Sequence, residues 1–98
     1  MTECVKRLKA GLKAAGVTTT KRVIPLRRAF KVRNGDGEHT GRVGYELTGV
    51  ASTWFEGTQE QVEILKSWFD SVDDGRGSFR SYWSDVRQNF WGWIETGG

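Results

Sequence analysis

The sequence predicts an α+β fold: a small antiparallel sheet of three to four strands with two helices packed on one face, in the order α-β-β-α-β. Three observations indicate it: two segments with apolar residues at helical spacing, two alternating segments joined by a glycine-rich turn, and an aromatic segment near the C-terminus. A chain of 98 residues has room for one domain, 1–98. Its 12% aromatic content, with five tryptophans, argues against disorder.

Residues 2–15 have the pattern of an amphipathic helix. Thr2 is the expected N-cap and Gly16 the expected stop. Gly11 weakens the middle of the helix by roughly 1 kcal/mol relative to alanine, so packing must stabilise it. The apolar residues recur at helical spacing: Val5, Leu8, Leu12 and Ala15.

From residue 23 to 33 the apolar period changes to two, which predicts a strand. Residues 34–37 carry the turn chemistry of a hairpin, with a loop that extends through Gly41. Residues 43–47 alternate again and predict the second strand. Gly49 then marks an expected bulge, after which residues 50–55 continue the strand.

The second helix is predicted to begin at a capping box formed by Thr58 and Gln61. It should end near Asp73-Asp74-Gly75, where carboxylates meet the negative end of the helix dipole unfavourably. We therefore expect a cation from the basic N-terminal segment to lie close to these aspartates. The apolar stripe of this helix consists of Val62, Leu65, Phe69 and Val72.

The C-terminal stretch gives two conflicting signals. Residues 90–95 are rich in aromatic and branched side chains, which favours a strand. Residues 78–88 stay open between strand and helix. The reason is that large residues recur at spacings of four, three, four and three, as in a helix: Phe79, Trp83, Val86, Phe90 and Trp93.

Charge is divided unequally along the chain. Residues 1–33 hold ten cations and one anion, a net charge of +9, whereas residues 34–98 hold five cations and eleven anions, a net charge of −6. Such an asymmetry is typical of a surface that binds a polyanion. The alternative is that the two segments face each other within one fold and cancel, and the sequence leaves both interpretations open.

Catalytic chemistry is thinly represented, so we expect no enzyme, no metal and no cofactor. His39 is the single histidine, and we expect a solvated position in the loop. Cys4 is the single cysteine, which excludes an intrachain disulfide. Neither of the common glycine-rich phosphate-binding motifs occurs. Without a long apolar run or an apolar secretion signal, a cytoplasmic protein with no membrane contact is expected.

Our first functional hypothesis is a non-enzymatic module that contacts nucleic acid, single-stranded in particular. Arg27, Lys31 and Arg33 project from one face of the first strand, while Arg28 interrupts the other. An ordinary solvated face would show the same spacing. The expected nucleic-acid contacts, from the first helix and this strand, are Lys6, Lys9, Lys13, Arg27, Arg28, Lys31 and Arg33.

The tryptophans carry a second expectation. In a strand, Trp91 and Trp93 share the face opposite Phe90 and Ile94, so both faces are apolar. Helices on one side cannot cover both, and we expect at least one exposed tryptophan for base stacking or for a protein partner. Most of the others are expected to fill the core: Trp54, Trp68, Trp83 and one of the 91/93 pair.

Three stretches within residues 8–72 follow one another in a suggestive order: Leu12-Lys13-Ala14-Ala15, Phe30-Lys31-Val32-Arg33, and Gly57-Thr58-Gln59-Glu60-Gln61-Val62-Glu63. In that order they resemble accessory domains attached to large polyvalent proteins of phages and conjugative elements. The resemblance implies a non-enzymatic phage or mobile-element protein, and it transfers no functional residue. The aromatic tail after Phe79 departs from it.

Two rival hypotheses come from other classes of protein. One is a small counter-defence inhibitor, anti-CRISPR-like, that binds a host nucleic-acid-binding protein complex. The other is a structural subunit of a homo-oligomer whose interface is the aromatic tail. The inhibitor would use the acidic segment 56–74, with Glu56, Glu60, Glu63, Asp70, Asp73 and Asp74.

Overall fold

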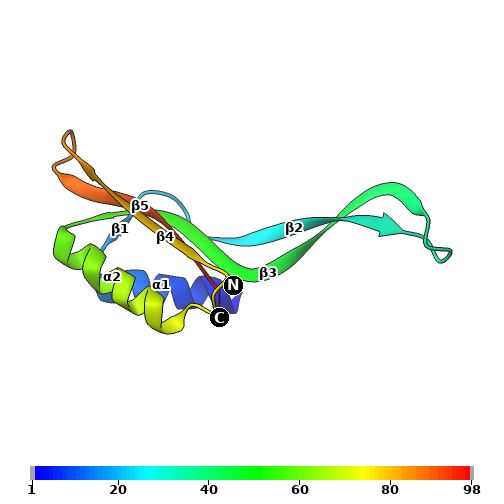
Figure 1. The fold of residues 1–98 in the computed structure, drawn as a ribbon, viewed down its shortest axis with the longest axis horizontal. Helices are drawn as coiled ribbons and strands as arrows, with labels where there is room; N and C mark the ends of the chain where they lie inside the picture. Colours follow the sequence, from blue (N-terminus) through cyan, green and yellow to red (C-terminus); the bar gives the residue numbers. More distant parts are fainter. Residues whose placement is uncertain (1, 98) are drawn as a thin grey trace.

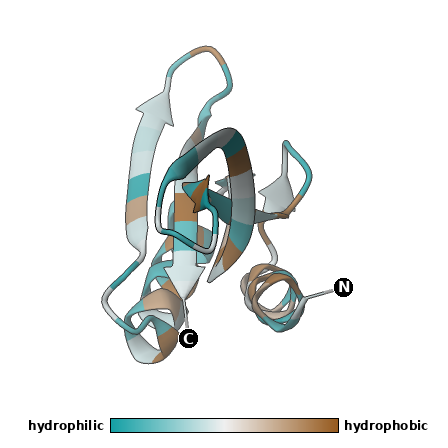
Figure 2. Ribbon diagram, turned by 90° about the vertical axis from the view of Figure 1, so that its right-hand side faces the viewer, coloured by the Kyte–Doolittle hydropathy of each residue, from teal (hydrophilic) through white to brown (hydrophobic). Residues whose placement is uncertain are grey.

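The computed structural model describes residues 2–97 and shows an α+β fold with two helices and a five-stranded antiparallel sheet. The elements in order are α1 (Glu3–Ala15), β1 (Thr18–Thr19), β2 (Ile24–Arg33), β3 (His39–Gly57), α2 (Gln59–Val72), β4 (Ser78–Ser84) and β5 (Asn89–Gly97). The strand order is β1-β3-β5-β4, and β2 pairs with β3. The predicted α+β class is thus confirmed, but the sheet has five strands where three to four were predicted. The short strand β1 was not predicted, and β4 forms in the stretch 78–88 that the sequence left open. Both helices lie side by side beneath the sheet (Figures 1 and 2).

The sheet is extended by a two-stranded projection. The C-terminal part of β3 pairs with β5 from Val50 onwards, whereas its N-terminal part pairs with β2 alone in the described chain. We call residues 26–49 the arm and the rest the body. The arm points away from the helices (Figure 1), and it makes the molecule 56 Å long but only 28 and 22 Å across.

The hydrophobic core lies between the two helices and the inner face of the sheet. Leu8 of α1, Leu65 of α2 and Phe55 and Ile94 of the sheet are fully buried. Among residues 2–97, no hydrophobic residue of the arm belongs to this core. The body therefore folds around its own interior, and the arm is a surface feature.

Both helix predictions are confirmed. Gly16 ends α1 in the left-handed conformation (φ 77°), with its N–H directed at the last carbonyls of the helix. Thr2 occupies the N-cap position, but its side chain makes no capping hydrogen bond within the described residues. In α2 the capping box is complete, since the Gln61 N–H donates to Thr58 Oγ1 and the Thr58 N–H donates to Gln61 Oε1.

The C-terminal stretch forms a hairpin. The strand predicted at residues 90–95 is confirmed as part of β5, and the open stretch 78–88 resolves into β4 and a turn. The turn includes Gln88 in the left-handed region (φ 51°). The helix-like spacing of large residues is misleading here because the hairpin carries aromatic side chains on both faces, such as Phe79 against the core and Tyr82 beside Trp91 on the opposite face.

Asp73 joins the end of α2 to the end of β5. Its carboxylate accepts hydrogen bonds from the N–H groups of Gly75, Gly77 and Gly97 and from the hydroxyl of Thr96. Burial raises the pKa of Asp73, but these four donors outweigh it, and the pKa lies below its ordinary value of 3.8. These hydrogen bonds thus offset the unfavourable interaction between the Asp73 carboxylate and the negative end of the α2 dipole.

The sequence predicted a cation from the basic N-terminal segment beside these aspartates, and this prediction is wrong. The cation is Arg76, from the loop after α2. Its Nε donates to Asp74 Oδ2 at 2.8 Å, and its Nη1 donates to the carbonyl of Thr48. The loop after α2 is close enough in sequence to supply its own counter-charge, and it also anchors the base of the arm.

Candidate nucleic-acid interface

Two bulges in β3 shape the arm. The register between β2 and β3 shifts at Gly49 and again at Gly41, and both glycines are left-handed, with φ 80° and 78°. The bulge at Gly49 confirms the sequence prediction. Gly41 lies within β3 rather than in the predicted loop, because β3 already begins at His39. Bulges increase the local twist of a ribbon.

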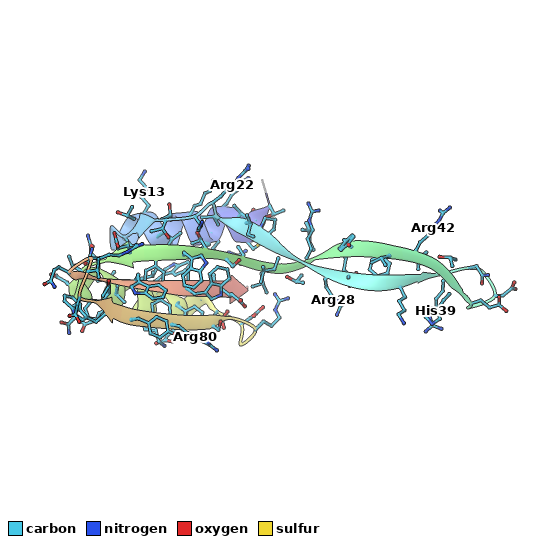
Figure 3. All side chains as sticks on the ribbon, turned by 90° about the horizontal axis from the view of Figure 1, so that it is seen from above. Lys13, Arg22, Arg28, His39, Arg42 and Arg80 are labelled. Atoms are coloured by element: carbon cyan, nitrogen blue, oxygen red, sulfur yellow. The ribbon has the colours of Figure 1, made fainter. Side chains whose placement is uncertain are left out.

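The twist is visible in Figure 3. Arg28 is opposite Glu46 in the register, and by strand alternation Glu46 and Arg42 belong to the same face of the ribbon. Arg28 and Arg42 nevertheless point to opposite sides of the molecule in this view. A two-stranded ribbon twists more strongly than a wide sheet, so one face of the arm winds around its long axis.

One face of the arm combines a basic row and an apolar row. Arg27, Lys31 and Arg33 share one face of β2 with Ala29, as predicted. Leu47 is opposite Arg27, Tyr45 is opposite Ala29 and Val43 is opposite Lys31, and these three form the apolar row on β3. We call this the mixed face, and the opposite side with Arg28 and Glu46 the paired face.

The mixed face is open to solvent. Tyr45 is 67% exposed, Val43 57% and Leu47 52%, which is unusual for three neighbouring apolar residues. The basic row beside them is exposed as well. The arm therefore presents charge and apolar surface together. The body borders the apolar row at Leu47, which lines a groove with Cys4 and Arg7 of α1.

Most cations of the basic N-terminal segment are free of ion pairs. Residues 2–97 contain four salt bridges, and Arg28 with Glu46 is the one that involves a cation from residues 1–33. The two halves of the charge asymmetry thus do not cancel through direct contacts in this part of the chain. Arg28 differs from the other six predicted contact residues, because its charge is already engaged on the paired face.

The helix lysines belong to a second basic group on the body. Lys9 and Lys13 line a groove of about 490 Å³ together with Lys21 and Arg22. Lys6 is exposed on the same helix. In Figure 3 Lys13 and Arg22 point to the same side of the molecule. The sequence reasoning did not select Lys21 and Arg22, although their adjacency just before a strand was a usable signal.

Three tryptophans form an aromatic face on the side of the sheet away from the helices. The ring centroids of Trp54 and Trp93 are 5.0 Å apart, those of Trp54 and Trp91 5.6 Å, and Tyr82 lies 5.1 Å from Trp91. Trp91 and Trp93 do share the helix-free face, as expected, but each is half-buried against its neighbours. The residue pattern of one β-strand cannot show that these aromatic side chains pack against one another and shield one another from solvent.

The expectation that most tryptophans fill the core is wrong. None of the five is buried in the described chain, although Trp68 packs against the core. Trp83 is the exposed tryptophan, at 50%, and its indole N–H donates to Asp85. The interior is instead filled by smaller aliphatic residues and phenylalanine, since two helices and a narrow sheet leave little space for indoles.

The acidic segment proposed for an inhibitor is largely engaged inside the molecule. Asp73 and Asp74 hold the loop after α2, Asp70 pairs with Lys66, and Glu56 pairs with Arg87. Among residues 2–97 two carboxylates of the segment have no ion pair and do not hold the loop after α2: Glu60 and Glu63. Four of the six carboxylates of the segment are therefore bound within the molecule, and Glu60 and Glu63 are exposed on α2.

The reactive side chains are placed apart from one another. Cys4 is buried in α1, and His39 is exposed at the start of β3 opposite Arg33. Residues 2–97 contain no cluster of three His, Cys, Asp or Glu side chains that could hold a metal ion. Neither helix in this part of the chain is long and apolar enough to span a membrane.

No family model, no curated protein and no solved structure matches this chain in the comparisons with known proteins. The resemblance to accessory domains of polyvalent proteins therefore stays a prediction. No relative supplies a role for the arm or for the aromatic face.

Proposed function

We propose that this chain is a non-enzymatic nucleic-acid-binding module that places the basic row of its arm along a phosphate backbone. The observation that carries the proposal is the state of Arg27, Lys31 and Arg33: all three are exposed, share one face and have no ion pair within residues 2–97. Because the backbone of β2 fixes the spacing of these cations, binding to a polyanion loses less conformational freedom than binding by cations on an unstructured segment.

The dimensions of the arm suit this role. A two-stranded ribbon is narrow enough to enter the major groove of a duplex. From residue 27 to 33 the row extends roughly 20 Å, at about 3.3 Å per residue. Three cations over that length would contact about three phosphates. The expected slope of the logarithm of affinity against the logarithm of salt concentration is then about −2.7 for duplex DNA and about −2.1 for a single strand.

The body offers two further contacts. The groove lined by Lys9, Lys13, Lys21 and Arg22 adds positive charge on α1 and the loop before β2. The aromatic face holds a cavity of about 400 Å³, lined in part by Trp54, Trp91 and Lys21. In this proposal phosphates contact the basic groove and unpaired bases stack on Trp91 or Trp93.

The test is a fluorescence titration with single- and double-stranded oligonucleotides at several salt concentrations. The variant Arg27→Glu with Lys31→Glu should lose most of its affinity and reduce the salt slope by about two. A matched control on α2, Lys66→Glu with Gln59→Glu and Ser67→Glu, makes the same change of four in net charge away from the arm, the basic groove and the aromatic face. It should keep most of the binding.

Two results would contradict the proposal. Wild-type protein that shows no binding at low salt excludes the function. Equal losses in the arm variant and in the control would mean that net charge, and not the arm, drives association.

A further inference from the structure

The second exposed feature of the arm is the outer edge of β3, which has no partner strand. Within residues 2–97, β3 pairs with β5 from Val50 onwards, and the carbonyl of Thr48 is bound by Arg76. Between Thr48 and the tip of the arm, one edge of β3 pairs with β2, and the other edge has no partner strand within residues 2–97. Unpaired N–H and C=O groups along an exposed edge are a template for another strand.

The side chains on this edge increase the tendency to pair. Val43, Tyr45 and Leu47 form the apolar row of the mixed face and lie next to the open edge. Edge strands usually carry charged side chains or proline that oppose such pairing. Here the charged residues of the same stretch, Arg42 and Glu46, have opposite signs and lie two positions on either side of Gly44.

We infer that the occupant of this edge is a second copy of the same chain, paired antiparallel about a two-fold axis at Gly44. In this register Arg42 of one copy is opposite Glu46 of the other, and Val43 is opposite Tyr45, each twice by symmetry. The product is a four-stranded arm, β2-β3-β3-β2, with a continuous apolar stripe along its centre.

Alternative registers satisfy the side chains less well. A shift by one residue places the apolar row of one copy beside the charged row of the other, because side chains alternate between faces. A two-fold axis at Tyr45 keeps the faces matched, but it sets Glu46 opposite Gly44 and Arg42 opposite Thr48. The axis at Gly44 is the one that aligns both apolar residues and opposite charges.

The pairing leaves the basic row free. Arg27, Lys31 and Arg33 are on β2, which becomes the outer strand on each side of the four-stranded arm. The dimer therefore does not depend on the proposed function, and it is tested on the protein without nucleic acid. A dimer would present two basic rows on the same ribbon.

The experiment measures the mass of the free protein by sedimentation equilibrium over a range of concentrations. Wild-type chain should form a dimer, and Arg42→Glu or Glu46→Arg alone should each weaken it by roughly tenfold or more, because two like-charge pairs then face each other. An equimolar mixture of the two variants should dimerise again. The double variant Arg42→Glu with Glu46→Arg, made together with Arg28→Glu to keep the ion pair inside the chain, should behave like wild type.

The controls separate this inference from the proposed function and from misfolding. Arg27→Glu with Lys31→Glu should keep the dimer even where nucleic-acid binding is lost. Far-UV circular dichroism checks that each variant is folded, and Arg42→Glu removes no ion pair within residues 2–97. Glu46→Arg breaks the ion pair with Arg28, so each variant that contains it is compared with the same variant carrying Arg28→Glu. A wild-type monomer at every soluble concentration, an assembly larger than a dimer, or a dimer that resists both single reversals would overturn the inference.

Discussion

Thr40 and Thr48, eight residues apart on β3, make the same pair of hydrogen bonds. Thr40 Oγ1 donates to the Val32 carbonyl at 3.0 Å and accepts from the Arg42 N–H at 3.3 Å. Thr48 Oγ1 donates to the Leu26 carbonyl at 3.0 Å and accepts from the Val50 N–H at 3.2 Å. A left-handed glycine follows each threonine. The sequence Thr-Gly is thus a repeated device that fixes both bulges and the twist of the arm.

Replacing Thr48 with valine should therefore destabilise the chain by about 1 kcal/mol, since the side chain keeps its shape and loses both hydrogen bonds. Thr40→Val should cost less, because its surroundings are exposed and water can replace the hydroxyl. Urea unfolding followed by tryptophan fluorescence gives both free energies. Equal losses of unfolding free energy at the two positions would show that the difference in burial between Thr40 and Thr48 does not affect the strength of their hydrogen bonds.

The two bulge glycines should also respond differently to alanine. At Gly41 a Cβ meets open space, so Gly41→Ala costs only the strain of the left-handed backbone, about 1 kcal/mol. At Gly49 the Cβ would lie 3.3 Å from Arg76 Nη2, next to the bond between Arg76 and Thr48. We expect a larger loss for Gly49→Ala in the same unfolding experiment. Similar losses would mean that Arg76 moves aside freely.

Gly11 in α1 reverses the usual effect of a helix glycine. Alanine normally stabilises such a position by about 1 kcal/mol. Here a Cβ on Gly11 would overlap the indole of Trp68, which packs against α1 from α2. Gly11→Ala should therefore destabilise by about 1–3 kcal/mol. Combining it with Trp68→Leu should recover part of that loss, and thermal unfolding that shows simple additivity would argue against the contact.

The Asp73 carboxylate should make stability depend on pH in the acid range. Its pKa is lowered in the folded chain relative to the ordinary 3.8. Its contribution is therefore fully present above pH 3.8 and is lost as the pH falls through the folded pKa. In Asp73→Asn this part of the pH dependence should disappear. Chemical unfolding between pH 2 and 6 measures it, and an unchanged acid slope would assign the effect to other carboxylates.

The elements that the sequence predicts well are those with strong local signals. Gly16, the Thr58 capping box and the bulge at Gly49 each follow from the chemistry of one or two residues, and all three occur in the structure. The second bulge, at Gly41, is hidden because Asn34 to Gly37 already supply enough turn residues for the hairpin.

Long-range features are less accessible from a single sequence. Periodicity shows that apolar and polar side chains alternate along β2 and β3. The bulges set the register between the two strands, and this register places Tyr45 beside the basic row. The arm itself exists because β3 is longer than β5, its neighbour in the body. The position of Trp54 beside Trp91 and Trp93 likewise depends on strand order, which no local pattern specifies.

The separation between the core and the arm has an evolutionary consequence. Within residues 2–97 every hydrophobic side chain of the core comes from outside residues 26–49, so mutations there leave the interior of the protein intact. Away from the two Thr-Gly bulges, the length, charge and loop sequence of this projection can drift or be selected with little effect on folding. Related chains should accordingly keep their two helices while their hairpins diverge in size and specificity.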